Sequence, residues 1–242
     1  MNKSSSENKQ DFHGVYEINL VPQGCLVEIK FPQDVYKKEN IRKFARSIFT
    51  LGHSTFSGSY IVNNRIECEK QVDEFNKMRK GLVEPKPLFQ DFLTEYLTDS
   101  IRICTGFENY FKYKLLNKGY IIHKMTTKKN VYPTLELSKP IELDLLLKLN
   151  NMNEQTINQS IKGMKNNTYS LSQIINPTNE FNKVLKAPKE FFEYLTILNE
   201  FRNTLHSCNI VKAKFSKYYL DILQRMELYL QAEFNDEMNS AL

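Results

Sequence analysis

Glycine and proline are scarce in this 242-residue chain, with eight of each, and tryptophan is absent. So few chain-breaking residues argue against collagen-like, low-complexity and many-turned all-β architectures. The chain also lacks a long uncharged apolar run and has a mean hydropathy of -0.49, so we expect no membrane-spanning helix and no membrane partner. Residues 1–11 are polar and lack the apolar core of a secretion signal, which favours a cytoplasmic protein.

Cysteine is rare as well, and its spacing fits neither a disulfide framework nor a zinc motif. We interpret the four cysteines as reduced, mostly buried thiols of a cytosolic protein. No histidine has a second histidine or a carboxylate at metal-binding spacing. A phosphate-binding loop, a dinucleotide fingerprint and a nucleophile elbow are also absent. The sequence therefore predicts no metal and no cofactor, and it gives no support to nucleotide hydrolysis, redox chemistry or serine hydrolase activity.

Apolar residues make up 41% of the chain and aromatic residues 12%, which is enough to bury a substantial core. The 33 basic residues outnumber the 28 acidic ones, giving a formal net charge of +5. Only seven of the basic residues are arginine, so lysine supplies most of the positive charge. This mild excess permits contact with nucleic acid without establishing it.

Apolar residues at spacings of three and four predict helices over 38–51, 60–80, 88–117, 189–206 and 212–234. We expect 52–58 to break the first of these helices, and Gly106 to be a weak point in the long third one. A short helix is predicted over 141–149, and only short helical turns over 150–182. Two β-rich runs flank the turn at 21–24 and indicate a hairpin.

The predicted fold class is mainly α: a helical bundle with a small N-terminal β-containing extension. The chain divides into a disordered tail (1–11), a β-hairpin plus helix extension (12–58), the helical bundle (59–235) and a C-terminal tail (236–242).

The most informative residues are Arg202 and His206, which are four residues apart. On a helix this spacing places both on one face, about one turn apart, with Asn203 beside them. His206 falls near the expected helix end, where the helix dipole favours the imidazolium. Such a histidine can take the proton of a ribose 2′-hydroxyl or protonate a leaving 5′-oxygen, and a guanidinium can stabilise charge on phosphorus. Neither step requires a metal, and Asn203 could orient a phosphate or the imidazole.

In these three residues the sequence resembles the HEPN superfamily, whose members carry an Arg, often followed by a polar residue, and a His near the end of a bundle helix. The resemblance covers roughly residues 60–234. It implies a helical bundle that forms a homodimer, with both motifs facing one cleft to make a metal-independent endoribonuclease site. It also implies a role in toxin–antitoxin, phage-defence or RNA-processing systems, with an antitoxin or defence protein as a partner. Three residues separate Arg202 from His206, fewer than the four to six usual in the family.

Two stretches without acidic residues, 109–135 and 201–220, add basic charge around this motif. If both line one cleft, they form an electrostatic track for a phosphate backbone. The candidate RNA-binding lysines are Lys112, Lys114, Lys118, Lys212, Lys214 and Lys217. Glu108, on the predicted long helix, could pair with Arg202 and hold it in position.

Structural interpretations remain open for each of these residues. Arg202 and His206 could simply satisfy the last carbonyls of their helix, the lysines could be solvated, and Glu108 could be an exposed helix residue. His123 lies in an apolar run and is better interpreted as a hydrogen-bonded structural residue, whereas His13 and His53 are expected in loops. The leading hypothesis is an RNA-cleaving HEPN-like homodimer. The alternative is a non-catalytic HEPN-like helical module that assembles with or regulates a partner protein, which the short Arg-to-His spacing favours.

Overall fold

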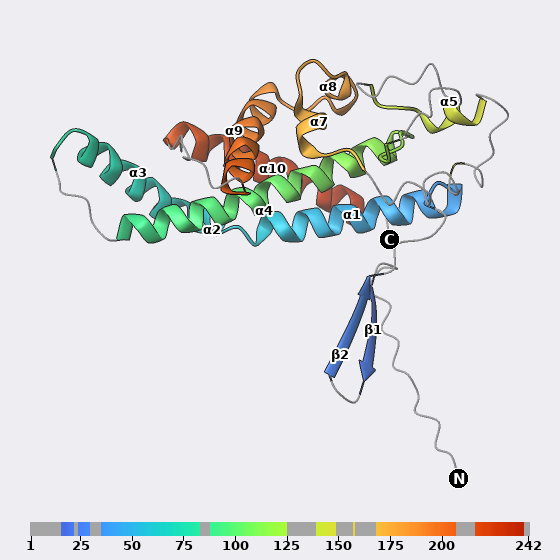
Figure 1. The fold of residues 1–242 in the computed structure, drawn as a ribbon, viewed down its shortest axis with the longest axis horizontal. Coiled ribbons are helices and arrows are strands. Elements are labelled where there is room, and N and C mark those ends of the chain that lie inside the picture. Colours follow the sequence, from blue (N-terminus) through green and yellow to red (C-terminus); the bar gives the residue numbers. More distant parts are fainter. Residues whose placement is uncertain are drawn as a thin grey trace, which may run out of the picture.

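A long central helix organises the structure, a computed structural model. The model describes residues 16–21, 24–29, 35–82, 88–124, 139–148, 157, 168–206 and 216–239. The central helix is α4 (Leu88–Asn117), and α1 (Lys38–Ser57) lies along it (Figure 1). The chain is mainly helical, as predicted. Within the described residues, every helix is too short or too polar to cross a membrane.

Several of the remaining helices contact α4 directly. The remaining helices are α2 (Tyr60–Asn63), α3 (Arg65–Arg79), α5 (Leu143–Lys148), α7 (Leu171–Ile175), α8 (Phe181–Leu185), α9 (Lys189–His206) and α10 (Lys217–Asn239). The predicted bounds of the helices at 88–117 and 189–206 are confirmed. α9 and α10 both contact α4 or its neighbours, so the described helices form a bundle (Figure 1).

Two strands precede the helices, β1 (Tyr16–Val21) and β2 (Gly24–Ile29). They pair antiparallel, with Tyr16 opposite Ile29 and Val21 opposite Gly24. The predicted tail at 1–11 lies outside the described residues, as does 240–242 of the predicted C-terminal tail. That the N-terminal segment forms a small extension of the bundle stays a prediction.

The first helix does not break where the sequence predicted. α1 continues through Gly52 and ends at Ser57, so the break expected over 52–58 is wrong. Gly52 is buried against α4, and its missing side chain lets the two helices approach closely. His53 consequently lies on α1 rather than in a loop, with its ring stacked 4.0 Å from that of Phe234 on α10.

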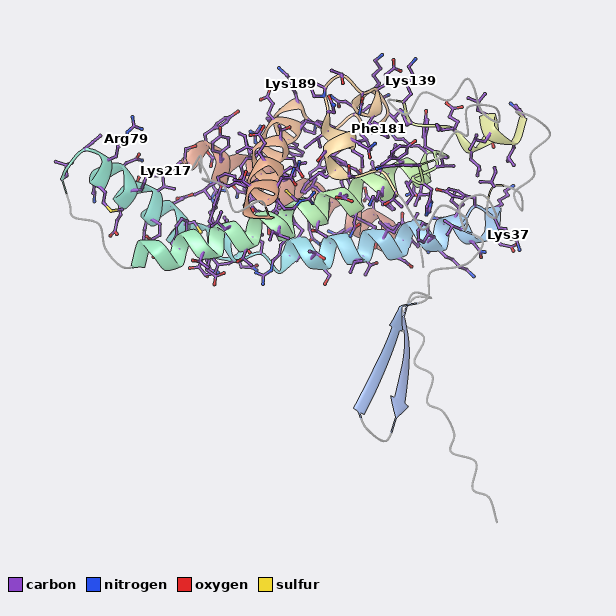
Figure 2. The ribbon with its side chains drawn as sticks, viewed as in Figure 1. Lys37, Arg79, Lys139, Phe181, Lys189 and Lys217 are labelled. Atoms are coloured by element: carbon purple, nitrogen blue, oxygen red, sulfur yellow. The ribbon has the colours of Figure 1, made fainter. Side chains whose placement is uncertain are left out.

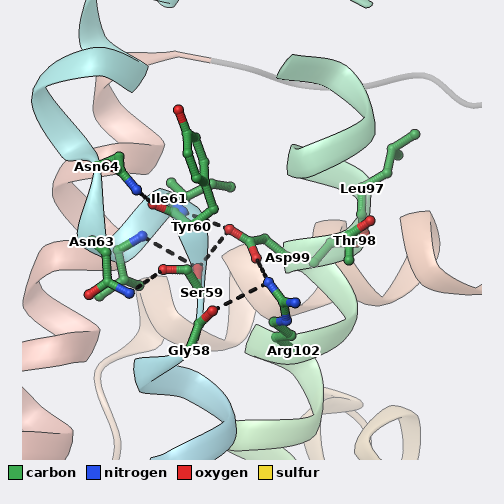
Figure 3. A network of polar contacts seen from close by, with 12 residues as sticks. Gly58, Ser59, Tyr60, Ile61, Asn63, Asn64, Leu97, Thr98, Asp99 and Arg102 are labelled. Atoms are coloured by element: carbon green, nitrogen blue, oxygen red, sulfur yellow. Dashed lines mark hydrogen bonds and ion pairs between the residues drawn. The ribbon is translucent and has the colours of Figure 1, made fainter. Parts of the chain in front are cut away.

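The predicted helix over 60–80 is divided at Asn64, where φ is -122° and ψ is 40°, into α2 and α3. The turn between α1 and α2 is fixed to α4 by the fully buried Asp99 (Figure 3). The Asp99 carboxylate accepts hydrogen bonds from the Ser59 hydroxyl at 2.9 Å and the Ile61 N–H at 2.6 Å. Arg102, which is partly exposed, donates to the other carboxylate oxygen at 3.0 Å. Asp99 therefore caps α2 from a neighbouring helix.

Aromatic rings dominate the core between α1, α4 and α9. The fully buried Phe107 ring of α4 contacts Phe56 of α1 and Phe191 of α9 at centroid distances of 5.5 and 6.2 Å. Phe111 stacks on Phe192 at 5.3 Å. These edge-to-face and stacked contacts bury large apolar areas, and they hold α9 against the C-terminal half of α4.

The segment before α1 is tied to the chain that follows α4. The Tyr36 hydroxyl accepts the Ile122 N–H at 2.8 Å and is hydrogen-bonded to the His123 Nδ1 at 2.8 Å. Both side chains are buried, and burial lowers the pKa of His123 to about 4. The interpretation of His123 as a hydrogen-bonded structural residue is confirmed.

The last turns of α10 are held by polar contacts. Lys114 pairs with Glu233 at 2.5 Å. Glu237 accepts hydrogen bonds from Arg46 and, at 2.7 Å, from the Tyr113 hydroxyl. Burial alone would raise the pKa of the Glu237 carboxyl, but these hydrogen bonds and the charge of Arg46 hold the pKa below its ordinary value.

Candidate functional site

Arg202 and Asn203 lie in the last turn and a half of α9. The Arg202 side chain is 20% exposed, and Asn203 is exposed beside it. α9 ends at His206, one turn beyond Arg202, and the imidazole of His206 lies outside the described side chains. The helix on which the motif was predicted is thus present, and it places Arg202 and Asn203 at the boundary between the core and the surface.

Glu108 of α4 reaches Arg202 of α9, as the sequence suggested. Glu108 Oε2 lies 3.7 Å from Arg202 Nη1. The other carboxylate oxygen of Glu108 accepts a hydrogen bond from Lys112 Nζ at 2.7 Å. Arg202, Glu108 and Lys112 form an ion cluster of two cations and one carboxylate, which we call the Arg202 cluster. If all three groups are charged, the cluster carries a net charge of +1.

Two contacts just before Arg202 hold this part of α9 in place. Phe201 is buried and its ring lies 6.0 Å from that of Tyr96 in α4. On the same helix, the buried Asn199 amide donates to the Ser172 hydroxyl of α7 at 2.9 Å. Since α4 and α7 both hold α9, the backbone beneath Arg202 has a defined position.

The Arg202 guanidinium keeps hydrogen-bonding capacity. A separation of 3.7 Å allows charge attraction but is too long for a hydrogen bond, and within the described residues this guanidinium donates none. A guanidinium carries five N–H donors in a planar fork that matches phosphate and carboxylate geometry. The partly exposed Arg202 can therefore accept an anion such as a phosphate while Glu108 holds it by charge.

Cys104 lies one turn before Glu108 on α4 and is fully buried. Burial raises the pKa of its thiol to about 12, although the positive charge of Arg202 acts in the opposite direction. The thiol stays protonated at neutral pH, so Cys104 does not supply a nucleophile to the Arg202 cluster.

The predicted RNA-binding lysines that the structure describes do not share one surface. Lys112 is buried, with only 8% exposure, within the Arg202 cluster, and Lys114 pairs with Glu233. Lys118 follows the C-terminal end of α4 and donates to the Val184 carbonyl. Lys217 pairs with Asp73 of α3 at 2.8 Å, at the end of the bundle where α3 lies (Figure 2).

The C-terminal end of α4, which Lys118 follows, and the start of α10, where Lys217 lies, are toward opposite ends of the bundle (Figure 1). Lys212 and Lys214 lie outside the described residues. The single electrostatic track that the two acid-free stretches suggested is not assembled by the described lysines.

Lys112 is the member of the Arg202 cluster whose position the sequence analysis missed. It was expected to contact RNA, but its ammonium faces Glu108. The local signal was available, because Glu108 and Lys112 are four residues apart with the glutamate first, the favourable order for a helical ion pair. Among the described residues, no group of three potential ligand side chains could hold a metal ion.

No known protein family, curated protein or solved structure matches this chain.

Proposed function

We propose that this chain is a metal-independent endoribonuclease of the HEPN type, acting in the cytoplasm within a toxin or phage-defence system. Arg202, Asn203 and His206 form the proposed catalytic group, and Glu108 supports Arg202. The observation that carries the proposal is the position of Arg202, held by charge against Glu108 at the end of α9 and donating no hydrogen bond to any other described residue. An arginine placed in this way suits a site for a phosphate that gains negative charge during reaction.

In the proposed reaction, the 2′-hydroxyl oxygen of RNA attacks the adjacent phosphorus and the bond from phosphorus to the 5′-oxygen breaks. The proton of the 2′-hydroxyl leaves to a base, and a proton is delivered to the departing 5′-oxygen. His206 serves one of these two steps, and Arg202 binds the non-bridging oxygens as their negative charge grows. The products are a 2′,3′-cyclic phosphate and a 5′-hydroxyl end, and no metal or cofactor takes part.

We propose that the active form is a homodimer. One chain supplies a single histidine in the motif, whereas the reaction needs one group to remove a proton and another to deliver one. Two copies whose α9 ends face one cleft would supply both, together with two arginines for one phosphate. The proposed architecture also includes the small N-terminal β-containing extension, to which we give no role in catalysis.

The test is cleavage of single-stranded and structured RNA by the purified full-length chain in the presence of a chelator. We expect cleavage that Arg202→Ala and His206→Ala each reduce about a hundredfold or more, because each removes a transition-state interaction. Arg225→Ala is a matched control, because Arg225 of α10 is a half-exposed arginine that pairs with Glu190 of α9 at 2.7 Å. Wild-type cleavage that survives in both motif variants would exclude the proposed site.

The second candidate function is a non-catalytic helical module that binds a partner protein. The short Arg-to-His spacing supports it, as do Ile66 and Leu82 at the α3 end of the bundle, which are 74% and 70% exposed. A folded wild-type chain that cleaves no RNA but forms a stable complex with a partner through this end would favour the module over the enzyme.

A further inference from the structure

Two cations from different helices share the Glu108 carboxylate. Lys112 Nζ lies 2.7 Å from one oxygen, and Arg202 Nη1 lies 3.7 Å from the other. The three side chains are between 10% and 20% exposed, so water screens these charges only in part. Glu108 accepts a hydrogen bond from Lys112 but only attracts Arg202 by its charge. The N–H donors of Arg202 are therefore not used by Glu108.

The unequal sharing matters because an arginine and a carboxylate can form two parallel hydrogen bonds. In that arrangement the face of the guanidinium that would bind a phosphate is occupied by the protein itself. At 3.7 Å the Arg202 guanidinium is not occupied in this way. Lys112 competes for Glu108, and the short hydrogen bond that Lys112 makes keeps the carboxylate away from Arg202.

We infer that Lys112 is a positioning residue, which draws Glu108 toward itself and leaves Arg202 able to bind an RNA phosphate. This inference rests on the proposed function and deepens it. It replaces the expectation that Lys112 binds RNA directly. Lys112 is buried and its ammonium faces Glu108, so a phosphate would have to displace that ion pair to reach it.

Replacing Lys112 should therefore act through Glu108. In Lys112→Leu, Glu108 is left with one cation, and a partly buried carboxylate with one cation moves into hydrogen-bonding contact with it. Arg202 is then occupied. A second change, Glu108→Gln, removes the charge that occupies Arg202, so Lys112→Leu should have little further effect in the Glu108→Gln background. Lys112→Arg keeps a cation beside Glu108 and should behave like the wild type.

The experiment is single-turnover cleavage of RNA by the full-length chain, with rate and half-saturating concentration measured separately. We expect Lys112→Leu to lower the maximal rate about tenfold or more with a half-saturating concentration changed less than about twofold. The double variant Lys112→Leu/Glu108→Gln should cleave within about threefold of Glu108→Gln alone. Lys189→Leu is the matched control, because Lys189 pairs with Glu193 at 3.2 Å as another helical i,i+4 pair, and lies exposed at the start of α9 (Figure 2).

Two results would overturn the inference. A weaker half-saturation with an unchanged maximal rate would make Lys112 an RNA contact. A loss of activity on Lys112→Leu that is equally large in the wild-type and Glu108→Gln backgrounds, in variants that fold normally, would make Lys112 a support of the fold alone.

A stability measurement separates failure of this inference from failure of the proposed function. If the wild type cleaves no RNA, the enzyme proposal fails, but competition for Glu108 can still be measured by thermal unfolding. The coupling between Glu108→Gln and Arg202→Gln should be larger in the Lys112→Leu background than in the wild type, because the pair is then in direct contact. Equal coupling in both backgrounds would show that Lys112 does not control the pair.

Discussion

Gly52 of α1 and Gly106 of α4 lie against each other at a close contact between the two helices. A Cβ on Gly52 would lie 2.8 Å from the Gly106 carbonyl oxygen, and a Cβ on Gly106 would lie 2.8 Å from the Phe56 Cβ. Neither distance can be accommodated without movement of a helix backbone or of a packed side chain. The pair of glycines therefore sets the separation of α1 and α4, on which the aromatic core and the position of Glu108 depend.

Adding one methyl group at this crossing should destabilise the protein. Gly52→Ala and Gly106→Ala are each expected to lower the free energy of unfolding by about 1–3 kcal/mol, because overpacking outweighs the gain in helix propensity. Urea denaturation followed by circular dichroism measures the change. Gly58→Ala is the control, since its added Cβ would meet its nearest atoms at ordinary distances of 3.5 and 3.6 Å. Equal stability of all three variants would contradict the close crossing.

Removal of the Asp99 carboxylate should be costly for a different reason. Asp99→Ala leaves the Ile61 N–H and the Ser59 hydroxyl without their acceptor inside the core (Figure 3). We expect a loss of about 2–4 kcal/mol in the free energy of unfolding. Asp221→Ala, which removes a 59% exposed aspartate paired with Arg65, should cost less than about 1 kcal/mol. A comparable loss in both variants, measured by urea denaturation, would refute the buried capping role.

The Tyr36–His123 pair should make stability depend on pH in the weakly acidic range. The ordinary pKa of histidine is 6.5 and burial lowers that of His123 to about 4, so between these values the unfolded chain binds a proton that the folded chain excludes. Stability contributed by neutral His123 is complete above pH 6.5 and is lost as the pH falls toward 4. The loss amounts to about 3 kcal/mol at most.

Unfolding measured at several pH values between 7 and 4 checks this dependence. A His123→Gln variant should show a flatter profile than the wild type over the same range, although it is less stable at neutral pH. Parallel profiles for the two proteins would assign the acid sensitivity to other groups, such as the Glu237 carboxyl, whose lowered pKa makes it a contributor at lower pH.

Arginine chemistry, rather than positive charge alone, should matter at position 202. Arg202→Lys keeps the charge near Glu108 but loses the planar fork that binds two phosphate oxygens at once. We expect RNA cleavage to fall about tenfold or more while the unfolding temperature changes little. Arg225→Lys serves as the control on an exposed helix face. Full activity of Arg202→Lys would show that Arg202 acts only through its positive charge.

The spacing of apolar residues correctly predicted those helices whose bounds depend mainly on their own residues. The apolar positions of 88–117 and 189–206 repeat at three and four, and both helices begin and end where this repeat does. The same logic identified His123, because a histidine within an apolar run must find a partner when it is buried. The approach of Glu108 to Arg202 was expected because it needs only two helix faces to meet.

Other features depend on what lies opposite in space. Glycine disfavours a helix by its own conformational preference, so Gly52 was expected to break α1. In the fold, Gly52 packs against Gly106, and this contact requires a residue without a side chain. Basic side chains were expected to contact RNA, but Lys112 is buried on Glu108, while Lys118 follows the C-terminal end of α4 and Lys217 lies at the start of α10, toward the opposite end of the bundle (Figure 1).

The sequence by itself determined that this chain builds mainly helices, which residues face inward on the longest ones, and that an arginine, an asparagine and a histidine stand together at one helix end. Those properties follow from spacing along a single segment, where neighbours are known. Only the tertiary structure decided which charges are paired, which glycines set the distance between helices, and which cation holds the carboxylate beside Arg202. Burial and pairing depend on segments far apart in the chain, so their energies arise only when those segments meet.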